Sequence, residues 1–262
     1  MTQLAGPDVC VLKVEEFDVD FALWIVNNKD ISKDERDAVK KILKDRQQGN
    51  KHETTYKLGK DIKHEDIGRF CAVRGTGLQA LTRECRAALA QRYYWDVDIR
   101  NCQPTLLEQY ANEHGWNCDK LKQFNARRED YIVELMNYLN ISRGDAKERV
   151  NCVMFGGTSS GMTPFFVNEL QPELNMLMRN VLNENATKYP TIAKKPNATR
   201  SMMANVLQTQ ERKCLIAMDT SLAKQGRSMD VYIHDGGLVH KKDGETSFPD
   251  EILRQVEADV LT

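Results

Sequence analysis

Three short segments contain the residues whose types and spacing could do chemistry. They are Asp98-Ile-Arg-Asn-Cys-Gln103, then Arg143 through Lys147 to Phe155-Gly156, and finally His234-Asp235-Gly236. Two carboxylates can share divalent metal ions, and a helix that bears cations can neutralise a triphosphate. Together, these residues are the smallest set of functional groups that an enzyme needs to transfer nucleotides on a template.

Asp98 ends a stretch in which apolar residues alternate with polar ones. From Tyr94 to Ile99 this alternation predicts a half-buried strand with Asp96 and Asp98 on the same face. A strand end suits a metal ligand, because the sheet fixes the carboxylate while the next loop admits substrate. Asp98 is the first candidate ligand and Asp96 the second. The alternative is a pair of solvated strand aspartates.

The middle segment predicts a helix with one chemically distinctive face. Four residues recur at every fourth position, namely Arg143, Lys147, Asn151 and Phe155. At 3.6 residues per turn they drift by only about 40° per step, so they share a broad face. Ser142 and Asp145 have the spacing of a capping box at its start, and Gly156-Gly157 suits its end. The cations could hold phosphates and the aromatic ring a base. The alternative is a solvated charged face with Phe155 in the core.

Asp235 lies between two apolar stretches, 231–233 and 238–240, which predict a hairpin joined by His-Asp-Gly-Gly. Asp and Gly are ordinary turn formers, so a plain tight turn is the alternative. The apolar flanks nevertheless place this hairpin in the core, where an unpaired carboxylate is costly. Asp235 is therefore the other candidate metal ligand.

Around these segments the pattern predicts a mainly helical chain. The expected helices cover 32–46, a stretch from 78 to 89, 104–115, 118–139, 142–156, 172–188, 202–224 and 249–261, with loops at 47–60 and 189–197.

The composition limits the classes of protein. The 262 residues are enough for a substantial core, but 37 Lys and Arg against 38 Asp and Glu give no overall basic charge, so nucleic-acid binding would need local clusters of cations. The seven cysteines contain no Cys-x-x-Cys pair, so neither a disulfide framework nor a zinc site is indicated. With no signal peptide and no apolar run of membrane length, an intracellular protein with no membrane partner is expected.

In this order, the three segments resemble motifs A, B and C of family-A polymerases, the group that contains bacterial DNA polymerase I and the single-subunit phage RNA polymerases. Residues 143–156 match motif B, R-x3-K-x3-F-x3-Y-G, without a gap. The similarity runs from about 67 to 242 and includes Gly68-Arg69-Phe70, Leu78-Gln79 with Arg83 and Arg86, and Asn205-Val-Leu-Gln208. The Asn-x-x-Pro-Thr-Leu-Leu form of the first segment is also similar to compact relatives carried by viruses and mobile elements.

This resemblance implies an α+β fold, a right-hand polymerase with an antiparallel palm sheet, helical fingers and a reduced thumb-like region. The expected regions are 1–66 (thumb-like), 67–115 (palm with motif A), 116–200 (fingers) and 201–262 (palm with motif C). The implied activity is template-directed DNA synthesis from a primer 3′-hydroxyl by a two-metal-ion mechanism. There is no room for a proofreading exonuclease domain, and processivity is expected to be low unless a partner supplies a clamp.

The resemblance also implies a role for each matched residue. Asp98 and Asp235 would hold two Mg²⁺ ions, with Mn²⁺ as a substitute, and Lys147 would protonate the leaving group. The nucleotide would be bound by Arg143, Lys147, Asn151, Phe155 and Gln103. The primer–template would be contacted by Arg69, Gln79, Arg86, Gln208 and His234.

The chain departs from the family pattern at four positions. Gln103 replaces a glutamate beneath the sugar, Asn151 a phenylalanine, Phe155 a tyrosine, and Gly236 a third acidic residue. Because Gln103 replaces the glutamate, both dNTPs and rNTPs are considered as substrates. The alternatives on the same fold are a primase, an RNA polymerase and a template-independent terminal transferase. A further alternative is an inactive nucleic-acid-binding accessory protein.

Overall fold

The computed structural model describes the chain except for residues 1–9, 48, 59–65, 74–75 and 262. The chain forms two compact units, which we call the sheet unit and the helical unit. The sheet unit combines Met1–Ile99 with Glu211–Thr262, and the helical unit is Arg100–Gln210. These borders follow compactness, and the four functional regions expected from the sequence stay predictions.

The sheet unit is built on an antiparallel sheet of β4 (Tyr94–Asp98), β6 (Gly236–His240) and β5 (Met229–Ile233), in that order. The expected strand and hairpin are therefore confirmed. The register pairs Tyr94 with His240 at one end and Asp98 with Gly236 at the other. The expected four-residue connection is wrong, because both glycines belong to β6 and the turn is only His234 and Asp235.

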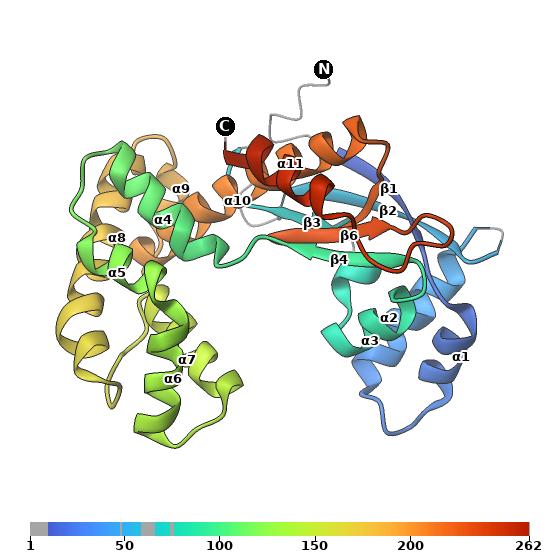
Figure 1. Cartoon of the computed structure of the whole chain (residues 1–262), viewed down its shortest axis with the longest axis horizontal. Helices are drawn as coiled ribbons and strands as arrows, with labels where there is room; N and C mark the ends of the chain where they lie inside the picture. Colours follow the sequence, from blue (N-terminus) through green and yellow to red (C-terminus); the bar gives the residue numbers. More distant parts are fainter. Residues whose placement is uncertain (1–9, 48, 59–65, 74–75, 262) are drawn as a thin grey trace. The chain divides into compact units, whose positions relative to one another are not determined.

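The two faces of this sheet enter two separate cores. Tyr94 packs with Val231 and Leu238 against α1 (Val19–Asn27), α2 (Lys33–Asp45) and α3 (Arg83–Ala90). Val97 and Ile99 face the other core, to which α11 (Asp250–Leu261) and the C-terminal part of α10 (Ala198–Lys224) contribute. Figure 1 shows α1 to α3 on one side of the sheet and α11 on the other. The alternation of β4 thus sorts its side chains as the sequence predicts.

A second antiparallel sheet has the order β1 (Cys10–Glu16), β2 (Lys51–Leu58), β3 (Phe70–Ala72). The loop expected over 47–60 is wrong, because β2 occupies most of it. Its burial alternates, with His52, Thr54 and Tyr56 turned inward. These inward residues all carry polar atoms, so a search for apolar periodicity misses the strand.

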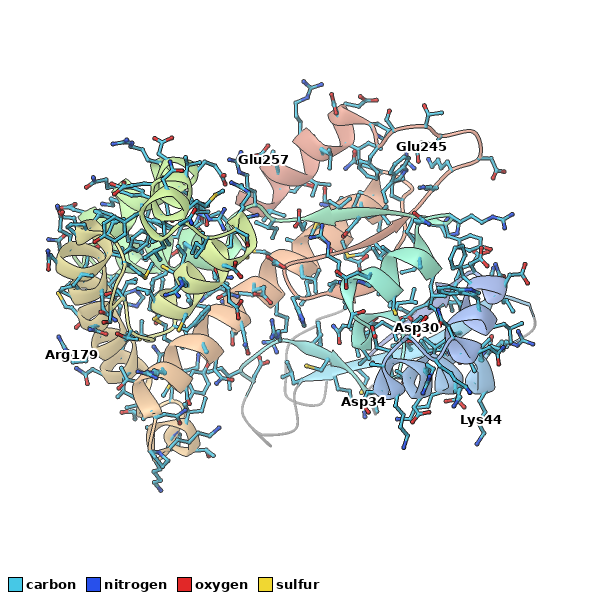
Figure 2. The ribbon with its side chains drawn as sticks, turned by 90° about the horizontal axis from the view of Figure 1, so that it is seen from below. Asp30, Asp34, Lys44, Arg179, Glu245 and Glu257 are labelled. Carbon is cyan, nitrogen blue, oxygen red and sulfur yellow. The ribbon has the colours of Figure 1, made fainter. Side chains whose placement is uncertain are left out.

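The helices of the sheet unit begin at identifiable caps. The Ser32 hydroxyl accepts the N–H of Glu35 at 3.3 Å and so caps α2. Asp34 in its first turn and Lys44 in its last, both labelled in Figure 2, match the helix dipole. The helix expected from residue 78 is corrected: Leu78–Ala80 is a 3₁₀ turn (η3), and α3 starts only after the Thr82 cap.

The helical unit contains a series of helices in chain order. They are α4 (Cys102–Glu113), α5 (Asp119–Ala126), α6 (Arg128–Leu139), α7 (Arg143–Met154), the π-helical turn η4 (Phe165–Leu170), α8 (Gln171–Asn185), α9 (Pro190–Ala193) and the start of α10. The single helix expected over 118–139 is broken at Arg127, whose φ of −128° leaves the helical region. The loop expected at 189–197 contains α9, which buries Ile192.

The core of the helical unit is rich in aromatic rings. Tyr131 of α6 stacks on Phe165 at 4.1 Å between ring centroids, with Phe124 and Phe166 packed edge-on nearby. This packing fixes α6, the helix on which α7 lies. Within the described ranges, no helix has both the length and the apolar character to cross a membrane.

Candidate functional site

Asp98 and Asp235, which we call the carboxylate pair, are brought together by backbone pairing. Asp98 ends β4, and its register partner Gly236 directly follows Asp235. The N–H of Ile99 donates to the Asp235 carbonyl at 3.1 Å, which extends the ladder past the strand end. Two residues 137 positions apart in the sequence (235 − 98) are therefore held at the same end of one sheet.

Gly236 is required by this close approach. A Cβ atom at this position would lie 2.3 Å from the Val97 carbonyl oxygen and 2.7 Å from Cα of Asp98. Such contacts with backbone cannot be relieved by rotating a side chain. A side chain at position 236 therefore has no room here, so this position adds no ligand to the carboxylate pair.

The acidic groups at this strand end influence one another. Burial raises the pKa of Asp235, and the negative charges of Asp98 and Asp96 raise it further, against the attraction of Arg69. Burial likewise raises the pKa of Asp96, with Asp98 adding to the effect and Arg86 opposing it. Crowded carboxylates that resist ionisation are stabilised by a bound cation.

The donors present suit a hard divalent ion. Mg²⁺ prefers carboxylate oxygens, typically one or two from the protein with phosphates and water completing the shell. Among the described residues, no group of three or more His, Cys, Asp or Glu side chains is arranged to hold a metal. The carboxylate pair could contribute two oxygen donors to such an ion.

Three predicted nucleic-acid contacts surround the pair. The pKa of His234 is lowered to about 4 by partial burial and by the nearby charges of Arg69 and Arg86, so its imidazole is neutral at pH 7. His234 also adopts a φ of +50°, a left-handed conformation that non-glycine residues rarely take and that clusters at functional sites. Arg69 is balanced by the buried Glu211 at 3.7 Å. The roles of all three in nucleic-acid binding stay predictions.

Gln79, a fourth predicted contact, has its amide occupied by backbone. Its oxygen accepts the N–H of Ala72 at 2.7 Å, and its nitrogen donates to the carbonyls of Phe70 and Tyr232 at 3.2 and 2.8 Å. These bonds tie β3 to β5 just before the His234–Asp235 turn. The buried Glu15, whose pKa is raised to about 7 by burial, accepts the N–H of Leu78 and fixes the same 3₁₀ turn. Gln79 therefore anchors the strand that leads into the His234–Asp235 turn.

In the helical unit, α7 presents the predicted face to solvent. The Ser142 hydroxyl accepts the N–H of Asp145 at 3.1 Å, which confirms the cap. The buried side of the helix is formed by Ala146, Val150, Val153 and Met154. On the opposite side, which we call the α7 face, Arg143 and Asn151 are exposed and Lys147 is half-exposed. Phe155 follows the last helical residue as its cap and is half-buried.

The cations of the α7 face have an acidic neighbour that the sequence did not reveal. Arg143 forms an ion pair with Glu129 of α6. This hydrogen bond lowers the pKa of Glu129, assisted by the charges of Arg128 and Lys147. Glu129 lies on a different helix, 14 residues before Arg143, and no motif or periodicity marks it.

Arg200 is a second residue that sequence reasoning missed. Gly156, with φ +79°, lacks the Cβ that would lie 2.9 Å from Nε of Arg200 and 3.1 Å from Sδ of Met178. The exposed Arg200 side chain therefore lies against Gly156, just past the end of α7. A usable signal existed, since residues 186–210 contain four cations and no acidic residue. The other two predicted contacts, Gln103 on α4 and Gln208 on α10, are half-buried in the same unit.

The overall fold resembles a polymerase domain. The polymerase domain of Pol1 from M. smegmatis, solved in complex with DNA primer-template and dNTP, superposes with a TM-score of 0.55, covering 86% of this chain and 47% of that one. The identity is 10%, so the likeness concerns the fold alone. It supports the α+β class expected from the sequence.

In sequence, the chain is similar to a viral protein. It is 26% identical over 209 residues to the putative helicase V13 of Sputnik virophage. The aligned region covers 74% of this chain and 26% of that protein. The chain thus spans about a quarter of the length of this relative. No family model matches the sequence.

Proposed function

We propose that the chain is the core of a template-directed DNA polymerase, which adds nucleotides to a primer 3′-hydroxyl by a two-metal-ion mechanism. The observation that carries this proposal is the carboxylate pair, which backbone pairing holds at one sheet end in a fold that resembles a DNA polymerase domain. The ordered motifs A, B and C support the family-A assignment.

In the proposed reaction, the sheet unit provides the metal site. Asp98 and Asp235 would hold the Mg²⁺ ions, which when bound activate the 3′-hydroxyl and neutralise the developing phosphate charge. His234, neutral at pH 7, can donate or accept a hydrogen bond without adding a positive charge. Arg69 and Arg86 would contact the phosphates of the primer–template.

The helical unit would bind the incoming nucleotide. Arg143 and Lys147 on the α7 face would neutralise the triphosphate, and Lys147 would donate a proton to the leaving pyrophosphate. Phe155 would stack on the nascent base pair, with Asn151 and Gln103 near the sugar. Exposed cations can reorient toward a ligand, so this face suits a substrate that arrives and leaves in each cycle.

A helicase activity is not proposed for this chain, although its virophage relative carries that name. The similarity covers only 26% of that protein. The 262 residues contain no Gly-x4-Gly-Lys-Ser/Thr loop, the sequence by which P-loop helicases hold phosphates.

The test is primer extension with the full chain and Mg²⁺, with the four dNTPs or the four rNTPs, and with or without template. We expect extension that requires the template and prefers dNTPs. Extension without template would favour a terminal transferase, and synthesis without primer would favour a primase. Nucleic-acid binding without extension under any of these conditions, with Mn²⁺ included, would contradict the proposal and favour an accessory protein.

A further inference from the structure

Glu129 of α6 is paired with a cation of the α7 face. It forms ion pairs with Arg143 and, at 3.1 Å, with Arg128. The side chains of Arg143 and Glu129 keep 46% and 40% of their surface exposed, so water reaches both partners. The contact joins α6 to α7 at the surface, outside the aromatic core of the unit.

The charge balance around Glu129 favours a further anion. Three cations, Arg128, Arg143 and Lys147, act on this single carboxylate, and together they keep its pKa below the usual range, so it is ionised at neutral pH. The other acidic residue at the start of α7, Asp145, is hydrogen-bonded to Ser142 at 2.7 Å. With Asp145 counted beside Glu129, the three cations still leave a net positive charge, which a multiply charged phosphate can satisfy.

We propose that Glu129 is the resident anion of the α7 face: it holds Arg143 between catalytic cycles and competes with the triphosphate and with pyrophosphate for that guanidinium. This inference rests on the proposed function and assigns a positioning role to a residue outside the three motifs.

The energetics of an exposed ion pair fit such a role. Solvent-exposed pairs contribute little to stability, because water screens the charges and both side chains lose freedom on pairing. A triphosphate can therefore displace Glu129 easily. When pyrophosphate leaves, the Glu129 carboxylate pairs with Arg143 again. This competition lowers the affinity of the α7 face for pyrophosphate as well as for the triphosphate.

Direct binding of inorganic pyrophosphate to the full chain, measured by titration calorimetry without nucleic acid, tests this role. Glu129→Gln keeps the shape of the side chain but removes its charge, and should bind pyrophosphate about twofold to fivefold more tightly, as expected for an exposed pair. In primer extension KM for dNTP should fall by a similar factor while kcat does not rise. Glu129→Ala should shift both values in the same direction.

The matched control is Asp130→Asn, which removes the neighbouring carboxylate one residue further along α6, whose side chain is more exposed (65%) than that of Glu129 (40%). Asp130 pairs with Arg127 at 3.0 Å and not with the α7 cations, so pyrophosphate affinity should stay unchanged. Arg143→Ala distinguishes a failure of the Glu129 role from a failure of the phosphate site itself. If Arg143→Ala weakens pyrophosphate binding while Glu129→Gln has no effect or weakens it, the role of Glu129 is overturned and the phosphate site stands. If Arg143→Ala leaves binding unchanged, the phosphate site of the proposed function fails, and the role of Glu129 fails with it.

Discussion

The carboxylate pair and the α7 face are built in different ways. The carboxylate pair is positioned by a strand register, a two-residue turn and a glycine with backbone within 3 Å of its missing Cβ. The cations of the α7 face lie on the solvent side of a helix, and one of them, Arg143, is held by an exposed ion pair. The carboxylate pair is fixed by main chain, which cannot move without the rest of the sheet. The α7 face is formed by side chains, which can move independently.

This difference matches what each ligand would require. Metal ions need oxygen donors at defined positions, so a rigid backbone frame is an advantage. Phosphates are bound mainly by charge, and a flexible cation can follow them as the ligand enters and leaves. Substitutions in the two regions should therefore fail differently, with all-or-none losses at the carboxylate pair and graded losses on the α7 face.

The largest effect is expected at the carboxylate pair. Asp98→Ala and Asp235→Ala should each abolish nucleotide addition, because losing a metal ligand removes several kcal/mol of transition-state stabilisation, about 10³-fold or more in rate. Asp96→Ala should keep much more activity. Rates come from single-turnover primer extension, and circular dichroism checks the fold. An inactive Asp96 variant beside an active Asp98 variant would shift the motif A assignment by two residues.

A graded loss is expected for Lys147→Ala. Removing one phosphate-directed donor typically costs a few kcal/mol in the transition state, so the single-turnover rate should fall by roughly 100-fold and nucleotide binding should weaken. Arg143→Ala should act mainly on binding. Near-normal chemistry in Lys147→Ala would mean that the α7 face does not hold the triphosphate.

A stability measurement can show whether the frame of the carboxylate pair is as tight as its contacts indicate. Gly236→Ala should lower the free energy of unfolding by about 1–3 kcal/mol, because the new methyl group meets backbone atoms. Gly144→Ala in α7 is the control, since its Cβ would meet nothing closer than the Ser142 hydroxyl at 3.6 Å. The control should be neutral or stabilising in chemical denaturation. Equal effects in the two variants would contradict the rigid frame.

The smallest effect concerns the sugar. Gln103 is neutral where the resembling family has glutamate, and Phe155 lacks the phenol of the tyrosine found there, so part of the polar discrimination against a 2′-hydroxyl is expected to be lost. We expect a preference for dNTPs with measurable rNTP incorporation, and a further rise of a few-fold in rNTP use for Gln103→Ala, since one lost polar contact is worth about 1 kcal/mol. The ratio of kcat/KM for matched dNTP and rNTP measures it. An unchanged ratio would exclude Gln103 as the sugar gate.

Local patterns predicted the elements of the site well. The alternation over β4, the Ser142 cap of α7 and the hairpin at Asp235 were all readable, because each depends on residues within a few positions of one another. The α+β class was expected from the family resemblance. The strand β2 was not readable, because its inward residues carry polar atoms and give no apolar alternation; the Tyr56 hydroxyl, for example, donates to Glu15 of β1.

Contacts between distant segments were beyond reach. Glu129 beside Arg143 and the Gln79 amide between β3 and β5 depend on how helices and strands pack, and neither leaves a periodic signal. In the sequence, Gly236 was visible only as a departure from the motif C pattern of the family that the chain resembles. Its cause, the approach of Asp98, needs the register of the sheet.

The strand order of the central sheet has a consequence for the order of folding. β6 is the middle strand, and β4 pairs with β6 alone in this sheet, across 138 residues from Asp98 to Gly236. During synthesis at about 5–20 residues per second, β4 therefore waits roughly 7–30 s for its partner. The helical unit, Arg100–Gln210, is continuous in the chain and is completed within that interval. The carboxylate pair is thus among the last features to form, and a chain released before residue 236 would carry a folded helical unit with Asp98 on an unpaired strand edge.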